Sequence, residues 1–326
     1  MIITEFLEGQ GLGNQLWMHA AGCSIAEQLG MPYLATGLDH FKGASFLEIK
    51  NSPDALSSGG PPQGIARFYE KLYFDPELNA YMCDFDTEVL NIAGPTLISG
   101  YFQSEKYFFG DLSRICRYVN LKAEWQKQCV DERTCILNVR GGEYKRHKNL
   151  CLPESYWIHA MRTMSERHQI KNFLVVTDDT RYARALFPTL PILEGGVAAC
   201  YAALFHARYV VLSNSSFSYF PVKGGRPKMQ VIAPMHWARF ANPLRRWASP
   251  ANVYSGWEWQ DATGNLHDYL ECQRQAEATS DYYHQQYYVA TTMGATRPPL
   301  WREHIPAPVR FAIKRALGRL FPTRIG

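Results

Sequence analysis

The sequence predicts an α/β fold made of two units in which strands and helices alternate along the chain. Short apolar runs alternate with longer stretches of helical periodicity, and glycines follow the first apolar run. Such alternation is typical of parallel sheets that helices cover on both faces. With 326 residues, 46% of them hydrophobic and 20% charged, the chain can bury a large core and suits two domains better than one.

The first unit begins at the N-terminus. Residues 2–7 form a strand-like run that ends at a glycine-rich segment, and helical periodicity then extends over residues 14–29. The next strand-like run is 33–36, so the order predicts a βαβ opening with glycines at the strand-to-helix turn. Residues 51–64 are rich in Pro, Gly and Ser and predict a loop, whereas 65–130 predict mixed structure.

The second unit continues the alternation more clearly. Strands are predicted at 135–139, 172–177, 209–213 and 229–233, and helices at 153–168, 179–187, 197–206 and 215–220. Two such units predict two Rossmann-like domains that face a cleft, where ligands bind at the carboxyl ends of strands. We place the N-terminal domain at residues 1–130, the C-terminal domain at 131–260 and a helical extension at 261–326.

Cysteine usage and the N-terminus indicate the compartment. The eight cysteines are scattered, form no Cys-x-x-Cys pair and often lie in apolar runs, which predicts reduced core residues in a cytosolic protein. The chain does not start with a cationic segment followed by an apolar core, so we expect no signal peptide. No apolar stretch approaches the roughly 18 residues of a membrane span.

The net charge of +4 is concentrated at the C-terminus, where residues 297–326 hold seven basic residues and one acidic residue. Within 309–321 the apolar residues follow the spacing of one helical face, with cations on the other side. A basic amphipathic helix suits an anionic membrane surface. Residues 305–326 therefore predict either peripheral contact with the inner membrane surface or a helix docked on the protein's own core. We expect no nucleic-acid partner.

The segment 138–144, Asn-Val-Arg-Gly-Gly-Glu-Tyr, points most directly to a function. It follows an apolar strand, which puts Arg140 at a strand end beside a Gly-Gly turn and near the cation of Lys145. The planar fork of an arginine holds two phosphate oxygens and stabilises charge on a departing nucleoside diphosphate. The segment predicts pyrophosphate binding by Arg140, and the alternative is a surface loop with solvated charges.

Three further segments have the composition of binding sites. Gly11, Gly13 and Asn14 form a glycine-rich turn that fits either a dinucleotide fingerprint or close helix packing. Residues 100–108 interleave aromatic residues with Gln, Ser and Lys, which suits a sugar-facing surface or a core cluster. Residues 177–179 and 213–218 follow strands, and their hydroxyl, amide and acid groups suit an anion and purine site or helix capping.

In this order the segments resemble the α-1,2-fucosyltransferases of glycosyltransferase family eleven, over roughly residues 1–260. The family's motifs are Gly-Gly-Leu-Gly-Asn-Gln, Gly-Tyr-aromatic-Gln-Ser-x-Lys-Tyr-Phe, His-x-Arg-Arg-Gly-Asp-Tyr, Ser-Asp-Asp, Asn-Ser-x-Phe-Ser and Pro-x-x-Trp. They correspond here to residues 10–15, 100–108, 138–144, 177–179, 214–218 and 234–237. The third motif departs from the family, because Asn138, Gly141 and Glu143 stand where the family has His, Arg and Asp.

The resemblance implies a glycosyltransferase of the GT-B type, with two facing Rossmann-like domains. It implies transfer of fucose from GDP-fucose to a hydroxyl of an acceptor glycan, with inversion and without a bound metal, in surface polysaccharide or oligosaccharide synthesis. The N-terminal half would hold the acceptor. The resemblance implies that Arg140 grips the β-phosphate, that Asn138 and Asp178 lie near the guanine, and that Ser215 and Ser216 approach the pyrophosphate. Gly11, Gly13, Asn14, Gly142 and Asn214 in the matched segments are further candidates for donor binding. Lys145, in the next turn, is a candidate to replace the cation that the family has at position 141.

An inverting transfer also needs a group that removes the proton of the acceptor hydroxyl. Glu8, near the glycine-rich turn, and His19, one helical turn beyond Gln15, are the candidates, with a packing role as the alternative for His19. Three other functions stay open: transfer from a different GDP-sugar, glycan or nucleotide binding without catalysis, and an NAD(P)-dependent oxidoreductase that uses the first βαβ unit.

Overall fold

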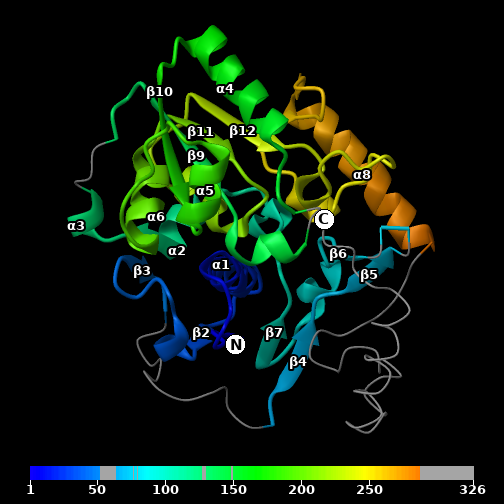
Figure 1. Ribbon diagram of the computed structural model, residues 1–326. Helices are drawn as coiled ribbons and strands as arrows, with labels where there is room; N and C mark the ends of the chain where they lie inside the picture. Colours follow the sequence, from blue (N-terminus) through cyan, green and yellow to red (C-terminus); the bar gives the residue numbers. More distant parts are fainter. Residues whose placement is uncertain (52–63, 76, 79, 127–129, 148–149, 287–326) are drawn as a thin grey trace, which may run out of the picture.

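The computed structural model describes residues 1–51, 64–75, 77–78, 80–126, 130–147 and 150–286. Two sheets form the framework (Figure 1). The N-terminal sheet has the order β2-β1-β7-β4 with all strands parallel. Its strands are β1 (Ile2–Glu5), β2 (Tyr33–Thr36), β4 (Ala66–Tyr69) and β7 (Thr96–Ser99).

The C-terminal sheet has the order β10-β9-β11-β12-β13-β14, and its strands are parallel except for the last pair. The strands are β9 (Thr134–Val139), β10 (Asn172–Thr177), β11 (Tyr209–Leu212), β12 (Gln230–Pro234), β13 (Glu258–Gln260) and β14 (Leu266–His267). The predicted α/β fold with two mainly parallel sheets is confirmed. This sheet extends past residue 260 into the segment predicted to be a helical extension, because β14 pairs with β13.

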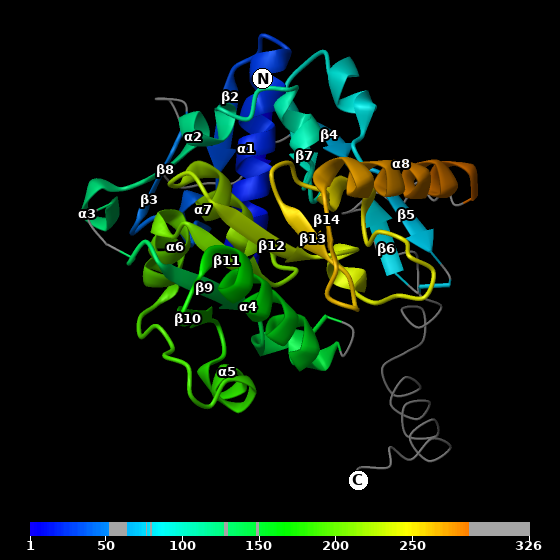
Figure 2. The ribbon, with the colours of Figure 1, turned by 90° about the horizontal axis from the view of Figure 1, so that it is seen from above.

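Helices pack against both sheets (Figure 2). They are α1 (Leu12–Gln28), α2 (Arg114–Tyr118), α3 (Ala123–Gln126), α4 (Glu154–His168), α5 (Thr180–Leu186), α6 (Val197–His206), α7 (Tyr219–Gly224) and α8 (Tyr269–Gln286). Two small antiparallel sheets complete the described chain: β3 (Leu47–Ile49) pairs with β8 (Val119–Leu121), and β5 (Leu72–Asp75) pairs with β6 (Ala80–Cys83).

Helix α1 lies between the two sheets and joins the two halves (Figure 1). Its residues 15–26 are buried around the whole circumference of the helix rather than along one stripe. The ring of Trp17 stacks on Phe108 from the N-terminal half and on Tyr254 from the C-terminal half. One continuous core therefore extends through both halves.

Polar contacts also cross between the halves. The amide oxygen of Asn14 accepts hydrogen bonds from Gln103 Nε2 at 2.9 Å and from Ser216 Oγ at 2.8 Å. Lys223 on α7 forms a buried ion pair with Glu105 at 2.7 Å. Because a buried charge is costly without a partner, this ion pair favours one relative position of the two halves.

Helix α8 covers the β5–β6 hairpin. The buried Tyr283 donates a hydrogen bond to Asp75 Oδ2 at 3.0 Å, and the Arg246 guanidinium binds the same carboxylate at 3.2 Å. Residues 305–326, for which we predict membrane contact or docking, lie outside the described residues. Among the described helices, none combines the length and the apolar composition that crossing a bilayer requires.

We predict that Gly13→Ala destabilises the protein by about 1–3 kcal/mol, as overpacking commonly does. A Cβ at Gly13 would lie 2.4 Å from the backbone nitrogen of Phe217 and 2.4 Å from the carbonyl carbon of Ser216. Urea unfolding measures the effect. Gly11→Ser is the matched control, because a Cβ at Gly11 meets nothing within 4 Å and serine is a good N-cap residue. Equal stability of the two variants would contradict the prediction.

Candidate functional site

The predicted site residues lie along the carboxyl edge of the C-terminal sheet. Asp178 follows β10, Arg140 follows β9 and Asn214 follows β11, in the order in which these strands are paired. Neighbouring strands lie about 4.8 Å apart, so these three positions form a row along this edge. Arg239, which the sequence did not single out, lies beyond the end of β12, in the short helical turn Trp237–Arg239. Two cavities open at the row.

The first cavity, here called the strand-end pocket, has a volume of about 340 Å³. Its lining residues include Asn138, Arg140, Thr177, Asp178, Ser215 and Phe217. The second, here called the central cleft, has a volume of about 850 Å³ and lies between the two halves. The N-terminal half contributes Asn14, Tyr81, Tyr101 and Gln103 to the cleft, and the C-terminal half contributes Tyr144, Asn214, Ser216 and Arg239.

Arg140 lies where the two cavities approach each other. It lines the strand-end pocket, and its guanidinium lies 5.2 Å from the ring centre of Tyr144, which lines the cleft. Its Nη1 pairs with Asp178 at 2.6 Å and its Nη2 with Glu143 at 3.2 Å. Its Nε is buried and has no partner among the described residues. The guanidinium is held in one orientation and keeps one donor unused.

The Gly141–Gly142 turn fits closely against the side chains of Asp178 and Asp179, which pair with Arg140 and Lys145 respectively. Gly142 has a φ of +37°, and a Cβ there would lie 2.3 Å from Asp178 Oδ2. A Cβ at Gly141 would lie 2.8 Å from Asp179 Cβ. The backbone N–H groups of Gly141 and Gly142 donate to Asp178 and Asp179. This packing gives a physical reason for glycine at position 141, where the family that the sequence resembles has arginine.

Asp179 has mainly structural contacts. Its carboxylate pairs with Lys145 and accepts a hydrogen bond from Tyr182 N at 3.0 Å, which caps α5. The hydrogen bond from Lys145, and then those from the backbone, lower the pKa of Asp179. Helix capping is thus the role that the structure shows for this acid, while Asp178 faces the strand-end pocket.

Asn214 is the clearest unsatisfied group in the cleft. The residue is only 3% exposed, and neither its side-chain nitrogen nor its side-chain oxygen has a hydrogen-bond partner among the described residues. Tyr144 OH donates to its backbone oxygen at 3.2 Å, which fixes the loop but leaves the amide unused. Since buried polar groups are almost always paired, an ordered water or a polar ligand is expected to contact this amide.

The strand-end serines have different surroundings. Ser215 lines the pocket and caps the short helical turn Ser216–Ser218. Ser216 lines the cleft and donates its hydroxyl proton to Asn14. Asn138 is buried at the pocket, where its side-chain oxygen lies 3.5 Å from Ser213 Oγ. Two adjacent cavities therefore collect the predicted residues Asn138, Arg140, Asp178, Asn214, Ser215 and Ser216 of the C-terminal half and Asn14 of the N-terminal half.

Other predicted residues are not brought to the cavities. His19 is fully buried, with Nδ1 2.8 Å from Tyr33 OH and Nε2 3.2 Å from the Tyr118 carbonyl oxygen. Burial lowers the pKa of His19 to about 4, so a packing role fits and a base role does not. Glu8 is exposed and lines neither cavity. Gly11 and Gly13 line neither cavity, and Gly13 packs against the Ser216–Phe217 backbone instead.

Sequence reasoning missed Tyr81 and Arg239. Tyr81 lies in the β5–β6 hairpin, inside a region that we could predict only as mixed structure. Arg239 follows β12, so its place after a predicted strand was a usable signal. Tyr101 and Gln103 belong to the segment predicted to face a sugar or to join the core, and both line the cleft.

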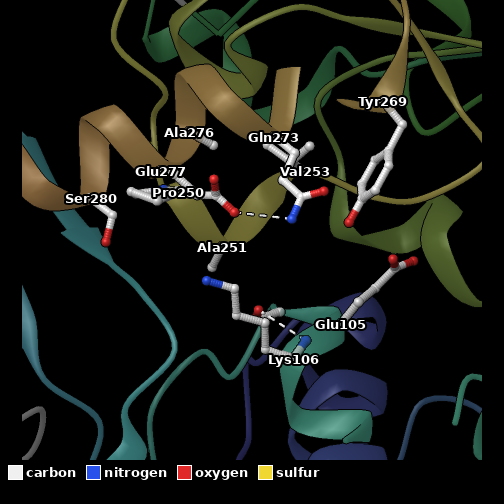
Figure 3. Close-up of a pocket in the computed structure, with 11 residues that line it drawn as sticks. Glu105, Lys106, Pro250, Ala251, Val253, Tyr269, Gln273, Ala276, Glu277 and Ser280 are labelled. Atoms are coloured by element: carbon white, nitrogen blue, oxygen red, sulfur yellow. Dashed lines mark hydrogen bonds between the residues drawn. The ribbon is translucent and has the colours of Figure 1, made fainter. Parts of the chain in front are cut away.

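A third cavity lies between α8 and residues 104–106 (Figure 3). Its volume of about 40 Å³ holds water but not a sugar or a nucleotide. Within the described ranges, no group of three or more His, Cys, Asp or Glu side chains is placed to hold a metal ion.

Glu70 supports the cleft wall from behind. Its Oε2 accepts hydrogen bonds from the backbone N–H groups of Tyr101 at 2.7 Å and Phe102 at 2.8 Å, and its Oε1 accepts one from Tyr107 OH at 2.9 Å. Burial raises the pKa of Glu70 to about 7. A titratable carboxyl group therefore holds the loop that presents Tyr101 to the cleft.

No protein-family model matches the chain, and no curated protein matches it in sequence. Among solved structures, it is similar to fucosyltransferase NodZ from Bradyrhizobium, with 13% identity, a TM-score of 0.40, and coverage of 68% of this chain and 92% of that one. It is also similar to POFUT1 in complex with GDP, with 11% identity, a TM-score of 0.44, and coverage of 71% and 97%. A third is FUT1 of Arabidopsis thaliana in complex with GDP, with 10% identity, a TM-score of 0.44, and coverage of 71% and 69%.

We predict that Glu70→Gln removes a fall in stability between pH 5 and pH 8. The pKa of Glu70 in the folded state lies above its usual value, so the folded protein keeps a proton that the unfolded chain has lost. The free energy of unfolding of the unsubstituted protein therefore decreases as the pH rises towards 7, by up to about 3 kcal/mol from this group. Urea unfolding across this range measures the difference. Glu8→Gln is the control, and identical pH profiles for all three proteins would disprove the assignment.

Proposed function

We propose that this chain is a glycosyltransferase of the GT-B type that transfers fucose from GDP-fucose to a hydroxyl of an acceptor glycan. The observation that carries the proposal is the position of Arg140 between a pocket at the ends of parallel strands and a large cleft. Pockets at strand ends are the usual nucleotide sites of such sheets. The ordered sequence resemblance to fucosyltransferases supports the choice of donor and a role in polysaccharide or oligosaccharide synthesis.

In this proposal the nucleoside occupies the strand-end pocket. The side chains of Asn138 and Asp178 supply polar atoms for a guanine, and Asp178 also orients Arg140. The diphosphate lies against Arg140. Its oxygens accept hydrogen bonds from the unpartnered Nε and from Nη2, which leaves Glu143 to bind the phosphate. Lys145, which is half exposed, supplies a second cation beside the Gly142 turn.

The sugar of the donor extends from Arg140 into the central cleft. There Asn214 offers an unpartnered amide, and Ser215 and Ser216 offer hydroxyl groups near the phosphates. The acceptor oxygen attacks the anomeric carbon from the face opposite the diphosphate, and the bond to the diphosphate oxygen breaks. Arg140 stabilises the negative charge that develops on that oxygen.

The proton of the acceptor hydroxyl must pass to a base as the new bond forms. Among the described residues that line the cleft there is no Asp or Glu, and His147 is the one imidazole. His147 is therefore our candidate for the proton acceptor in place of Glu8 and His19.

From the charge pattern of residues 305–326 we also propose peripheral contact with the cytoplasmic face of an anionic membrane.

We predict that Arg140→Ala lowers the rate of GDP-fucose hydrolysis by roughly 100- to 1,000-fold, as removal of a charge-stabilising donor does. The measurement is release of GDP from a panel of GDP-fucose, GDP-mannose and a UDP-sugar, with NAD as a binding control. Arg146→Ala is the matched control, because Arg146 is exposed and lines neither cavity.

An unchanged rate in Arg140→Ala would refute the role of Arg140. A preference for GDP-mannose would replace the donor while keeping the mechanism. Tight GDP binding without turnover on any acceptor would identify a binding protein. This is the second candidate function, because Arg140 is already paired with two carboxylates.

A further inference from the structure

The far end of the central cleft has its own chemistry. Arg140 and Arg239 follow β9 and β12, with β11 between them in the sheet. Two strand spacings of about 4.8 Å put the ends of these strands roughly 10 Å apart. The end of the cleft at Arg239 is bounded by the β5–β6 hairpin, since Leu78, Tyr81, Met82 and Cys83 line the same cleft. Arg239 lines the central cleft and Arg140 lines the strand-end pocket, so the two guanidinium groups belong to different cavities.

Two exposed aromatic rings line the cleft from the N-terminal half. Tyr81 is 47% exposed and Tyr101 is 38% exposed, and both residues line the wall of the cleft. The Tyr81 ring packs on Phe74 at 5.1 Å between ring centres, and the backbone of Tyr101 is held by Glu70. Fixed aromatic faces of this kind suit the apolar faces of pyranose rings.

Arg239 faces them as an unpaired cation. It lines the cleft and forms no ion pair with any described residue, and its buried Nε has no hydrogen-bond partner there. Its neighbour Arg246, by contrast, is paired with Asp75. The described lining of the cleft includes no Asp or Glu. The Asp75 carboxylate also acts on Arg239, but it is already bound by Arg246 and Tyr283. A half-buried guanidinium without an ion pair of its own, in a cavity whose described lining has no carboxylate, attracts an anion from outside the protein.

We infer that the acceptor of the proposed transfer is an anionic glycan, whose carboxylate or phosphate group binds Arg239 while its sugar rings contact Tyr81 and Tyr101. The inference rests on the proposed function and deepens it by naming the acceptor class. A carboxylate of a uronic acid and a phosphate monoester share the chemistry that the guanidinium recognises, because both accept its paired donors.

The test measures binding of matched oligosaccharides by NMR titration in the presence of GDP. The probes are a disaccharide that ends in glucuronic acid, its carboxyl-reduced counterpart that ends in glucose, and the glucose disaccharide phosphorylated at its terminal residue. We expect the unsubstituted protein to bind one or both anionic probes at least about 10-fold more tightly than the neutral one. The two anionic probes distinguish a uronic acid from a sugar phosphate.

Arg239→Gln should weaken binding of the preferred anionic probe by about 10- to 100-fold, the usual effect of losing a hydrogen bond to a charged group. Binding of the neutral probe should not change. Arg184→Gln is the matched control, since Arg184 is exposed on α5 and lines neither cavity. Tyr101→Ala should weaken all three probes alike.

Equal or tighter binding of the neutral probe, or no binding of either anionic probe, overturns the inference. So does an Arg239→Gln variant that loses affinity for GDP instead of for the glycan, because Arg239 would then belong to the donor site. GDP titration of the unsubstituted protein tests the proposed function separately. Anionic glycan binding through Arg239 without any nucleotide binding would keep the anionic-glycan site but reject the transferase, and with it the role of that glycan as an acceptor.

Discussion

The contact between the start of α1 and the loop after β11 is the constraint on which the rest of the structure depends. Gly13 lies so close to the backbone of Ser216 and Phe217 that no side chain fits between them. Asn14 extends the contact by binding Gln103 and Ser216 with one oxygen. The first turn of α1 and the loops after β7 and β11 therefore meet at one point, and the central cleft lies beside it.

Charge pairing separates the groups that hold the fold from those that await a ligand. Glu105 and Lys223 satisfy each other where the halves meet, and Asp179 satisfies both Lys145 and the Gly142 turn. Arg140 is held by carboxylates but keeps a buried donor free. Asn214 and Arg239 have no such partners among the described residues, although burial makes an unpaired polar group costly. These three residues line the two cavities: Arg140 lines the strand-end pocket, and Asn214 and Arg239 line the central cleft.

The departures from the fucosyltransferase motif have a structural context. At position 141 the space beside the backbone is taken by Asp179 and Tyr182, so a residue larger than glycine does not fit there. A second arginine at that position would displace the acid that pairs with Lys145. In the proposed function, Lys145 in the next turn is the cation that takes over the charge of the missing side chain. The space beside Gly141 is filled by Asp179 and Tyr182 rather than left empty.

The sequence by itself determined the α/β alternation and, to within one residue at each end, the bounds of β9–β12 and α4–α6, because hydrophobic periodicity and turn residues are local properties of the chain. It also identified the strand-end residues Arg140, Asp178 and Asn214, since a side chain after a parallel strand lies at the ligand edge of the sheet. Only the tertiary structure decided that His19 packs in the core, that Gly13 serves helix packing, and that Tyr81 and Arg239 share one cleft. Those outcomes depend on contacts between residues far apart in the chain, which local patterns do not encode.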